Sequence, residues 1–205
     1  MTISLENISK RYNYEWIFRK ISVEFVHGNS YAILGPNGSG KSTLLQILAG
    51  ALSHSGGKIR YRLNDKEISN ENIFLQIAIA APYLELVEEL TLTEFLQFHR
   101  QFKPFLPGIT IPQIIRSVEL EKAAHKQIRY FSSGMKQRAK LAQAIFSDVP
   151  VILLDEPCSN LDADGVKLYQ QLVQDHCMER LTIISSNDEQ EYGMCGEKIQ
   201  MMDYK

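Results

Sequence analysis

Apolar and polar residues alternate along much of the first third of the chain, and a period of two predicts β-strands. The segment 30–34 is a short apolar run, which indicates a buried strand, and alternation returns from 58 to 63 before a hairpin signal at Asn64-Asp65. Residues 73–80 form another apolar run that we expect to be a strand. The alternating apolar residues are Ile3, Leu5, Ile21, Val23, Phe25, Ile59, Tyr61 and Leu63.

A helical pattern begins at residue 91. Thr91 and Glu94 form a capping box that predicts the start of a helix, and a proline-containing stretch at 104–108 ends it. Two further helical runs are expected at 111–118 and 120–124. The apolar residues of the first helix are Phe95, Leu96, Phe98 and Phe102.

Helices and strands alternate in the rest of the chain, which predicts a mostly parallel sheet with right-handed crossovers. We expect one α/β domain over 1–205, with an N-terminal antiparallel β region. Its core would comprise about 1–87 and 134–205, with an inserted helical lobe at about 88–133. The remaining elements are expected at 134–147 (helix), 151–154 (strand), 164–176 (helix), 181–185 (strand) and 199–202 (strand).

The composition is that of an ordinary globular protein, 44% hydrophobic and 22% charged. The net charge is −2, so the chain lacks the excess of basic residues that would indicate nucleic-acid binding. The chain has no run of apolar residues long enough to span a membrane, and its start does not resemble a secretory signal, so we expect a cytoplasmic protein. The three cysteines lack metal-ligand spacing, which is typical of a protein in a reducing compartment. We expect them to be packing residues rather than reactive thiols. They are Cys158, Cys177 and Cys195.

Residues 35–43 match the phosphate-binding pattern G-x-x-x-x-G-K-[ST], between an expected strand and an expected helix at 43–49. Its glycines let backbone N–H groups approach phosphate oxygens, and the helix start adds free N–H groups. Because a helix dipole contributes only about 0.3–1 kcal/mol, Lys41 must supply a full charge for the β- and γ-phosphates, and Ser42 a Mg²⁺ ligand. The alternative is a glycine-rich turn that happens to contain a lysine. The loop residues are Gly35, Pro36, Asn37, Gly38, Ser39, Gly40, Lys41, Ser42 and Thr43.

Two carboxylates, Asp155 and Glu156, follow the apolar run 151–154. In open parallel sheets, ligands bind at the carboxyl ends of strands. Asp155 can hold Mg²⁺, directly or through water, and Glu156 can deprotonate a water aimed at the γ-phosphate. A positioned general base typically contributes about 10²–10⁴-fold in rate. The alternative is that the pair only ends a strand, and the phosphate loop upstream favours the catalytic interpretation over it.

The segment 131–138, Phe-Ser-Ser-Gly-Met-Lys-Gln-Arg, resembles the signature motif of ATP-binding cassette (ABC) ATPases, and 159–162 resembles their D-loop. With the phosphate loop, these motifs cover almost the whole chain in the family's order. The resemblance implies a P-loop NTPase core and a head-to-tail pair of identical or homologous subunits with two ATP molecules between them. The residues that it places on the partner's nucleotide are Ser132, Ser133, Gly134 and Asp162. The alternative for the serines is a helix cap with no ligand.

The same resemblance makes Tyr12 the candidate for stacking on adenine, worth about 1–3 kcal/mol, although the rings of 12–16 could instead pack only against the sheet. The chain departs from the family's pattern in three places. The signature begins Phe-Ser-Ser-Gly-Met rather than the common Leu-Ser-Gly-Gly-Gln, although Ser132 and Gly134 are kept. The other two departures bear on coupling to the membrane partner and on catalysis. The glutamine expected between core and lobe is not evident at 81–83, and Asn187 stands in place of the switch histidine. Asn187 can donate a hydrogen bond to the γ-phosphate but carries no charge. We therefore expect slow ATP hydrolysis that depends on Glu156.

The leading hypothesis is the ATP-hydrolysing subunit of an ABC transporter, at the cytoplasmic face of the membrane, with a separate membrane-spanning permease as partner and ATP and Mg²⁺ as ligands. The alternative is a soluble ABC-type ATPase that acts in complex assembly. A small-molecule kinase would leave the signature and D-loop without a role. The acidic loop 85–89 lies where the family meets its permease, or it is simply a solvated loop. No pattern indicates the transported substrate or the direction of transport.

Overall fold

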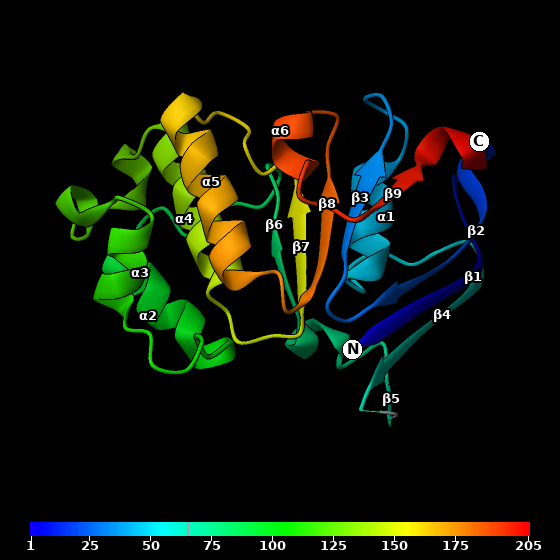
Figure 1. Cartoon of the computed structure of the whole chain (residues 1–205), viewed down its shortest axis with the longest axis horizontal. Coiled ribbons are helices and arrows are strands. Elements are labelled where there is room, and N and C mark those ends of the chain that lie inside the picture. The colour runs from blue at the N-terminus through cyan, green and yellow to red at the C-terminus, as the bar shows by residue number, and fades with distance from the viewer. Residues whose placement is uncertain (65) are drawn as a thin grey trace.

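Two β-sheets form the framework of the protein (Figure 1). The computed structural model describes residues 1–64 and 66–205, so Asp65 of the expected hairpin signal lies outside the described residues. The antiparallel sheet has the order β2-β1-β4-β5, and the parallel sheet has the order β6-β7-β8-β3-β9. The strands are β1 (Thr2–Tyr12), β2 (Glu15–Val26), β3 (Ser30–Leu34), β4 (Gly56–Leu63), β5 (Lys66–Ile68), β6 (Ile77–Ala80), β7 (Val151–Asp155), β8 (Leu181–Ser185) and β9 (Glu197–Gln200).

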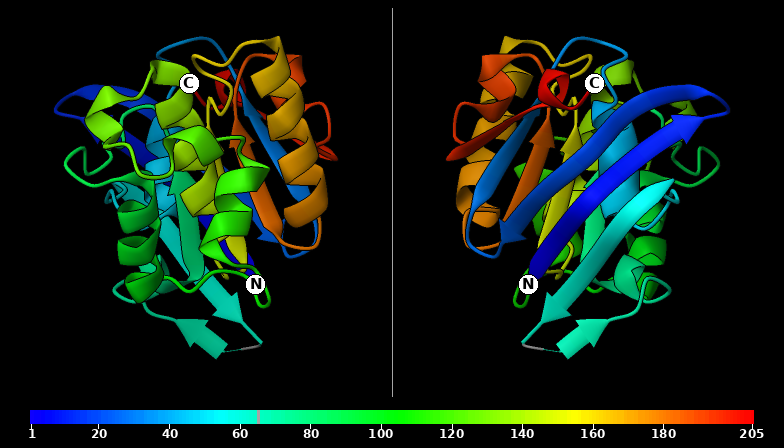
Figure 2. Two further views of the ribbon diagram at one scale, coloured as in Figure 1. Left: turned by 90° about the vertical axis from the view of Figure 1, so that its left-hand side faces the viewer. Right: turned by 90° about the vertical axis from the view of Figure 1, so that its right-hand side faces the viewer.

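Helices α2 and α3 lie at the opposite end of the molecule from the antiparallel sheet, as the two views of Figure 2 show. Both begin with a capping box, at Thr91 with Glu94 and at Thr110 with Gln113, which satisfies the free N–H groups of the first turn. The first box was predicted from the sequence and is confirmed. The helices are α1 (Lys41–Leu48), α2 (Leu92–Phe102), α3 (Ile111–Ser117), α4 (Ser133–Ile145), α5 (Ala163–His176) and α6 (Glu189–Tyr192), and the 3₁₀ helices are η1 (Ile73–Gln76), η2 (Glu121–Ala123), η3 (Ile128–Tyr130) and η4 (Met201–Tyr204).

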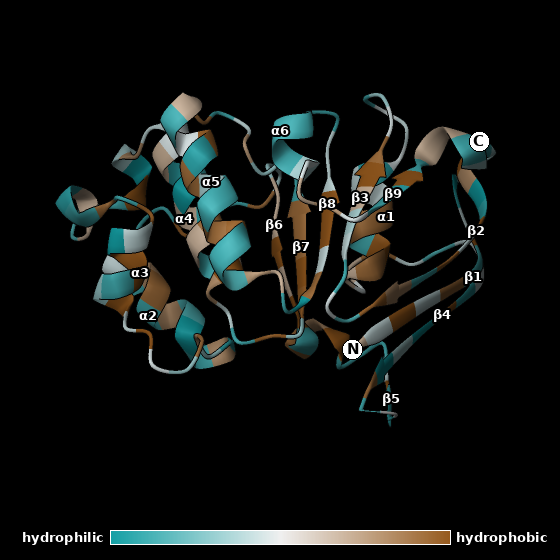
Figure 3. Cartoon of the chain, in the orientation of Figure 1, coloured by the Kyte–Doolittle hydropathy of each residue, from teal (hydrophilic) through white to brown (hydrophobic). Residues whose placement is uncertain are grey.

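The parallel sheet separates two hydrophobic clusters. One joins it to α1 and the antiparallel sheet, and the other joins it to α4 and α5. Strands β7 and β8 are therefore apolar along most of their length, whereas the outer side of α5 is polar (Figure 3). The second cluster continues into α2 and α3, so the helical segment shares one core with the sheet. We propose that residues 88–133 nevertheless correspond to the inserted lobe.

Three expected elements differ from the structure. Residues 73–76 form η1 rather than a strand, and only Ile77–Ala80 pairs in the sheet, because an apolar run cannot by itself distinguish a strand from a helical turn. The last strand ends at Gln200, since η4 begins at Met201. The run expected at 120–124 is a single 3₁₀ turn, η2.

The aromatic content of α2 was expected to help form its apolar face, but only part of it does. Phe95 and Leu96 are buried, whereas Phe98 and Phe102 are exposed and pack edge-to-face on each other with ring centroids 5.0 Å apart. Within the described part of the chain, no helix has the length and apolar character needed to cross a membrane.

Candidate functional site

The phosphate loop joins β3 to α1, in the arrangement that the sequence predicts. Gly40, the residue before α1, has φ 101°, and a Cβ there would lie 2.6 Å from Ile17 Cγ2. Gly35 has φ 148°, and a Cβ there would lie 2.8 Å from Ser39 Oγ. Glycine is therefore required at both positions by backbone and space. No side chain of the described residues caps α1, which leaves its first N–H groups available to an anion.

Lys41 lies over this loop. Its Nζ donates to the carbonyl of Gly35 at 2.8 Å and to that of Pro36 at 3.5 Å, and the residue is only 5% exposed. The ammonium group is thus held against the first two residues of the loop. The adjoining cavity, of about 350 Å³, is lined by Ile17, Asn37, Gly38, Gly40, Lys41, Ser42, Thr43 and Glu156.

Asp155 ends β7 and is 1% exposed, yet its Oδ1 has no hydrogen-bond partner among the described residues. Burial raises the pKa of Asp155, and the hydroxyls of Ser42 and Ser185 partly oppose that shift. A buried carboxylate oxygen without a partner is costly unless a cation or a donor meets it. The donor set of a carboxylate and the Ser42 hydroxyl therefore fits Mg²⁺, which prefers few protein oxygens together with phosphates and water.

Glu156 follows directly and adopts a left-handed backbone with φ 42°. Its N–H donates to the carbonyl of Ser185 at 2.9 Å. The residue lines the phosphate-loop cavity and also a neighbouring cavity of about 640 Å³, which Asn37, Asp162 and Asn187 line as well. A carboxylate between these cavities has access to a water near a bound phosphate.

Asn187 contacts the phosphate loop directly. The Gly35 N–H donates to Asn187 Oδ1 at 3.2 Å, and the neighbouring Ser186 N–H donates to the carbonyl of Ile33 at 3.2 Å. The structure thus brings together the phosphate loop, the two carboxylates and Asn187, as expected from their places at the carboxyl ends of β3, β7 and β8.

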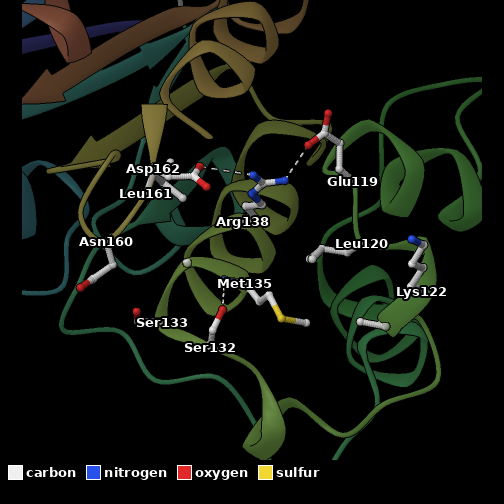
Figure 4. Close-up of a pocket in the computed structure, with 12 residues that line it drawn as sticks. Glu119, Leu120, Lys122, Ser132, Ser133, Met135, Arg138, Asn160, Leu161 and Asp162 are labelled. Carbon is white, nitrogen blue, oxygen red and sulfur yellow. Dashed lines mark hydrogen bonds and ion pairs between the residues drawn. The ribbon is translucent and has the colours of Figure 1, made fainter. Parts of the chain in front are cut away.

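The signature serines lie in a different cavity, of about 450 Å³ (Figure 4). Ser132 caps α4 by accepting from the N–H of Met135 at 3.3 Å, and Ser133 opens the helix. Asp162 caps α5 by accepting from Gly165 N–H at 2.8 Å and lies 3.7 Å from Arg138. Among the described residues, this cavity shares none of its lining with the phosphate-loop cavity. Its lining residues are Glu119, Leu120, Lys122, Ala123, Ser132, Ser133, Gly134, Met135, Arg138, Asn160, Leu161 and Asp162.

Tyr12 ends β1 at the tip of the hairpin with β2, and it is 49% exposed. Its ring packs under Lys10, with Nζ 4.7 Å from the centroid. Tyr14 and Trp16 are exposed too, so these rings do not merely pack against the sheet. Tyr12 is accessible to a base, and its stacking on adenine stays a prediction.

Three residues near the site were not singled out from the sequence. Tyr83 lies in the stretch 81–83, where the family's glutamine is expected, and burial together with the charge of Asp155 raises the pKa of its phenol. Gln137 and Glu191 are buried polar side chains that bond to the loop after Glu156. Gln137 lies inside the signature segment 131–138, which gives it no role of its own, and Glu191 lies in the short polar helix α6.

A glycine loop between strand and helix, followed by a strand that ends in two carboxylates, defines a P-loop NTPase domain. The chain matches the family described as ABC transporter over residues 18–159. It is 33% identical to the cytochrome c biogenesis ATP-binding export protein CcmA of Rhizobium meliloti (strain 1021), over 97% of this chain and 96% of that protein. The chain therefore belongs to the ATP-binding subunit family of ABC transporters.

One further relative is similar in sequence, and two solved structures are similar in fold. The uncharacterized ABC transporter ATP-binding protein YxlF of Bacillus subtilis (strain 168) is 35% identical over 80% of this chain, which spans only 55% of YxlF. A putative ABC transporter ATP-binding protein from Pyrococcus furiosus has a TM-score of 0.83 at 21% identity, with 100% of both chains covered. A dimeric ATP-binding cassette bound to ADP and Pi has a TM-score of 0.82 at 20% identity, covering 97% of this chain and 93% of its own. These two structures share the fold.

Proposed function

We propose that two copies of this chain, or one copy and a homologous subunit, bind two ATP molecules between them and hydrolyse them. The observation that supports this proposal is that the phosphate loop and the signature serines line two separate open cavities. The phosphate loop lines one of them, and Ser132, Ser133 and Gly134 line the other. A second subunit in head-to-tail orientation would bring the serine half of one protomer to the phosphate half of the other.

Each residue of the phosphate half has a role in the proposed reaction. Lys41 and the free N–H groups of α1 bind the β- and γ-phosphates, and Ser42 and Asp155 would hold Mg²⁺. When bound, that ion neutralises charge on the phosphate oxygens. Glu156 takes a proton from the attacking water, and Asn187 donates a hydrogen bond to the γ-phosphate.

We further propose that the ATPase drives a membrane-spanning permease from the cytoplasmic face, with no nucleic-acid partner. Exposed apolar side chains support a protein partner, because large exposed apolar patches are unusual on a monomer. Phe98 and Phe102 protrude from α2, and Phe74 of η1 is exposed as well. Lys103 Nζ, just after α2, donates to the carbonyl of Ile77, just after η1. The alternative, a soluble assembly ATPase, predicts no recovery with membranes.

The pairing is tested with Glu156→Gln, which keeps the nucleotide contacts and removes the proposed base. Light scattering with saturating ATP and Mg²⁺ should give twice the monomer mass, and steady-state phosphate release should fall by about 10²-fold or more. The control is Glu156→Gln combined with Lys41→Met, which should stay monomeric. A monomer for Glu156→Gln alone at saturating ATP would contradict the proposal.

A further inference from the structure

A single peptide unit beyond Glu156 is hydrogen-bonded at both of its polar ends by buried side chains. Gln137 Nε2 donates to the carbonyl of Pro157 at 2.7 Å. The N–H of Cys158 donates to Glu191 Oε1 at 2.7 Å. Because this carbonyl and this N–H belong to the same planar peptide group, the two side chains together fix its orientation. We call this pair the peptide clamp.

The two members of the clamp come from the segments that carry the other site residues. Gln137 lies on α4, which Ser132 caps, and Glu191 lies on α6, which follows the loop that carries Asn187. Figure 1 shows α6 beside the end of β7 and α4 on the side toward α2 and α3. The clamped peptide therefore links the signature helix, the loop after β7 and the loop after β8.

Both side chains are almost fully buried, Gln137 at 2% and Glu191 at 5% exposure. Burial raises the pKa of Glu191, and the bond from Cys158 together with the Ser186 hydroxyl opposes that shift. A polar side chain kept at such depth costs stability that an apolar one of the same size would not. A carboxylate acceptor also makes the bond from Cys158 stronger than a neutral acceptor would.

The backbone of Glu156 needs such support. A left-handed conformation at φ 42° is unfavourable for a non-glycine residue by about 1–2 kcal/mol, and it persists only where the surroundings hold it. On one side, the Glu156 N–H is bonded to the Ser185 carbonyl at 2.9 Å. On the other side, the Glu156 carbonyl accepts from the Ser159 N–H at 3.0 Å. The peptide after that, Pro157–Cys158, is held by the clamp. Both peptides that flank the Cα of Glu156 are thus hydrogen-bonded, and the clamp fixes the one that follows them.

We propose that Gln137 and Glu191 are positioning residues for ATP hydrolysis, which hold the Pro157–Cys158 peptide so that Glu156 is aimed at the attacking water. This inference rests on the proposed ATPase function. Neither residue lines the phosphate-loop cavity, and Glu191 lines only the neighbouring cavity of about 640 Å³. We therefore expect the clamp to act on the chemical step rather than on nucleotide binding. A mutation far from the reacting atoms that displaces a catalytic group by about 1 Å can lower the rate by about 10²-fold.

The first test separates hydrolysis from binding. Glu191→Met and Gln137→Met should each lower the single-turnover rate of ATP cleavage by about 10- to 100-fold, with the Kd for ATP changed less than about three-fold. Glu191→Gln retains an acceptor oxygen and should recover most of the rate. The matched control is Tyr169→Phe, which removes the bond from that hydroxyl to the Glu191 backbone carbonyl, 2.8 Å, and should keep the wild-type rate.

Gln137→Met and Glu191→Met act on the same peptide from opposite sides. If one of them fails to fold, the other still tests the proposal. A second readout is the exchange of the Cys158 amide hydrogen by NMR, which should be slow in the wild type and in Tyr169→Phe and much faster in Glu191→Met. Wild-type cleavage rates in both Met variants, or an equal loss of ATP binding, would overturn the positioning role. A wild type that binds ATP without releasing phosphate would overturn the proposed function, while unchanged Cys158 exchange in Glu191→Met would overturn the clamp itself.

Discussion

The backbone N–H of Gly35 donates a hydrogen bond to Oδ1 of Asn187 across 3.2 Å. This contact joins the first residue of the phosphate loop to the loop after β8. It also uses the amide oxygen of Asn187, so the two hydrogens on Nδ2 remain as donors. An asparagine at this position can therefore hold the loop and contact a phosphate at the same time, without a positive charge.

Asn187→Asp should separate these two tasks. The carboxylate still accepts from Gly35, but it cannot donate to a phosphate and adds a negative charge beside it. We expect steady-state phosphate release to fall by about 10²–10³-fold, the usual effect of losing one donor to a developing anion. The control is Asp188→Asn, which changes the charge of the adjacent residue and should have a much smaller effect. An Asn187→Asp protein as active as the wild type would remove Asn187 from the reaction.

Lys41→Met should weaken ATP binding without unfolding the protein. A hydrogen bond to a charged group contributes about 1.5–3 kcal/mol, so the Kd for ATP should rise by about 10- to 100-fold. Titration with a fluorescent ATP analogue measures this. Lys140 is a matched control because its Nζ also donates to two backbone carbonyls, those of Ala81 and Pro82 at 3.3 and 2.9 Å. Lys140→Met should bind ATP normally, and equal losses in both variants would argue against a specific role for Lys41.

The stability of the protein should fall in mild acid because of His99. Its Nε2 lies 2.8 Å from Ser147 Oγ, and its ring stacks on Phe105. Burial, and then the charge of Lys103, lowers the pKa of His99 to about 4 from an ordinary value of 6.5. A lowered pKa in a base means that the folded state binds fewer protons than the unfolded state, so stability is complete above pH 6.5 and is lost as pH falls toward 4.

His99→Gln removes this titration. Urea unfolding at pH 7.5 and pH 5 should show a smaller loss of unfolding free energy for the variant than for the wild type, by on the order of 1 kcal/mol. His54→Gln is the control, because that histidine lies elsewhere on the chain and should leave the acid loss unchanged. Equal pH dependence in the wild type and His99→Gln would refute the prediction.

The exposed rings of Phe98 and Phe102 should matter for a membrane partner and not for the isolated ATPase. Replacing both with serine should change the free energy of unfolding by no more than about 0.5–1 kcal/mol, as is usual for surface positions, and leave phosphate release unchanged. Recovery of the protein with the membrane fraction of cells should fall several-fold. Tyr130→Ser, at another exposed ring, is the control. A wild type that never fractionates with membranes would favour the soluble assembly function.

The phosphate loop and the Asp155-Glu156 pair could be predicted from sequence because each is a contiguous stretch whose chemistry depends on its own residues. Gln137 and Glu191 could not. Each lies among other polar residues of a helix, with no pattern that sets it apart. The Pro157–Cys158 peptide meets them only through the packing of α4 and α6 around the end of β7. In the same way, the separation of the signature serines from the phosphate loop is a property of the fold and not of either motif.

The end of β7 places two successive residues in states that oppose folding. Asp155 buries a carboxylate oxygen without a partner among the described residues, and Glu156 holds a backbone that suits glycine or asparagine better. If thermal stability alone were selected, Asn-Gly would suit positions 155 and 156 better. Substitutions that stabilise the protein at these two positions should therefore lower its ATPase activity, so melting temperature and turnover should change in opposite directions there.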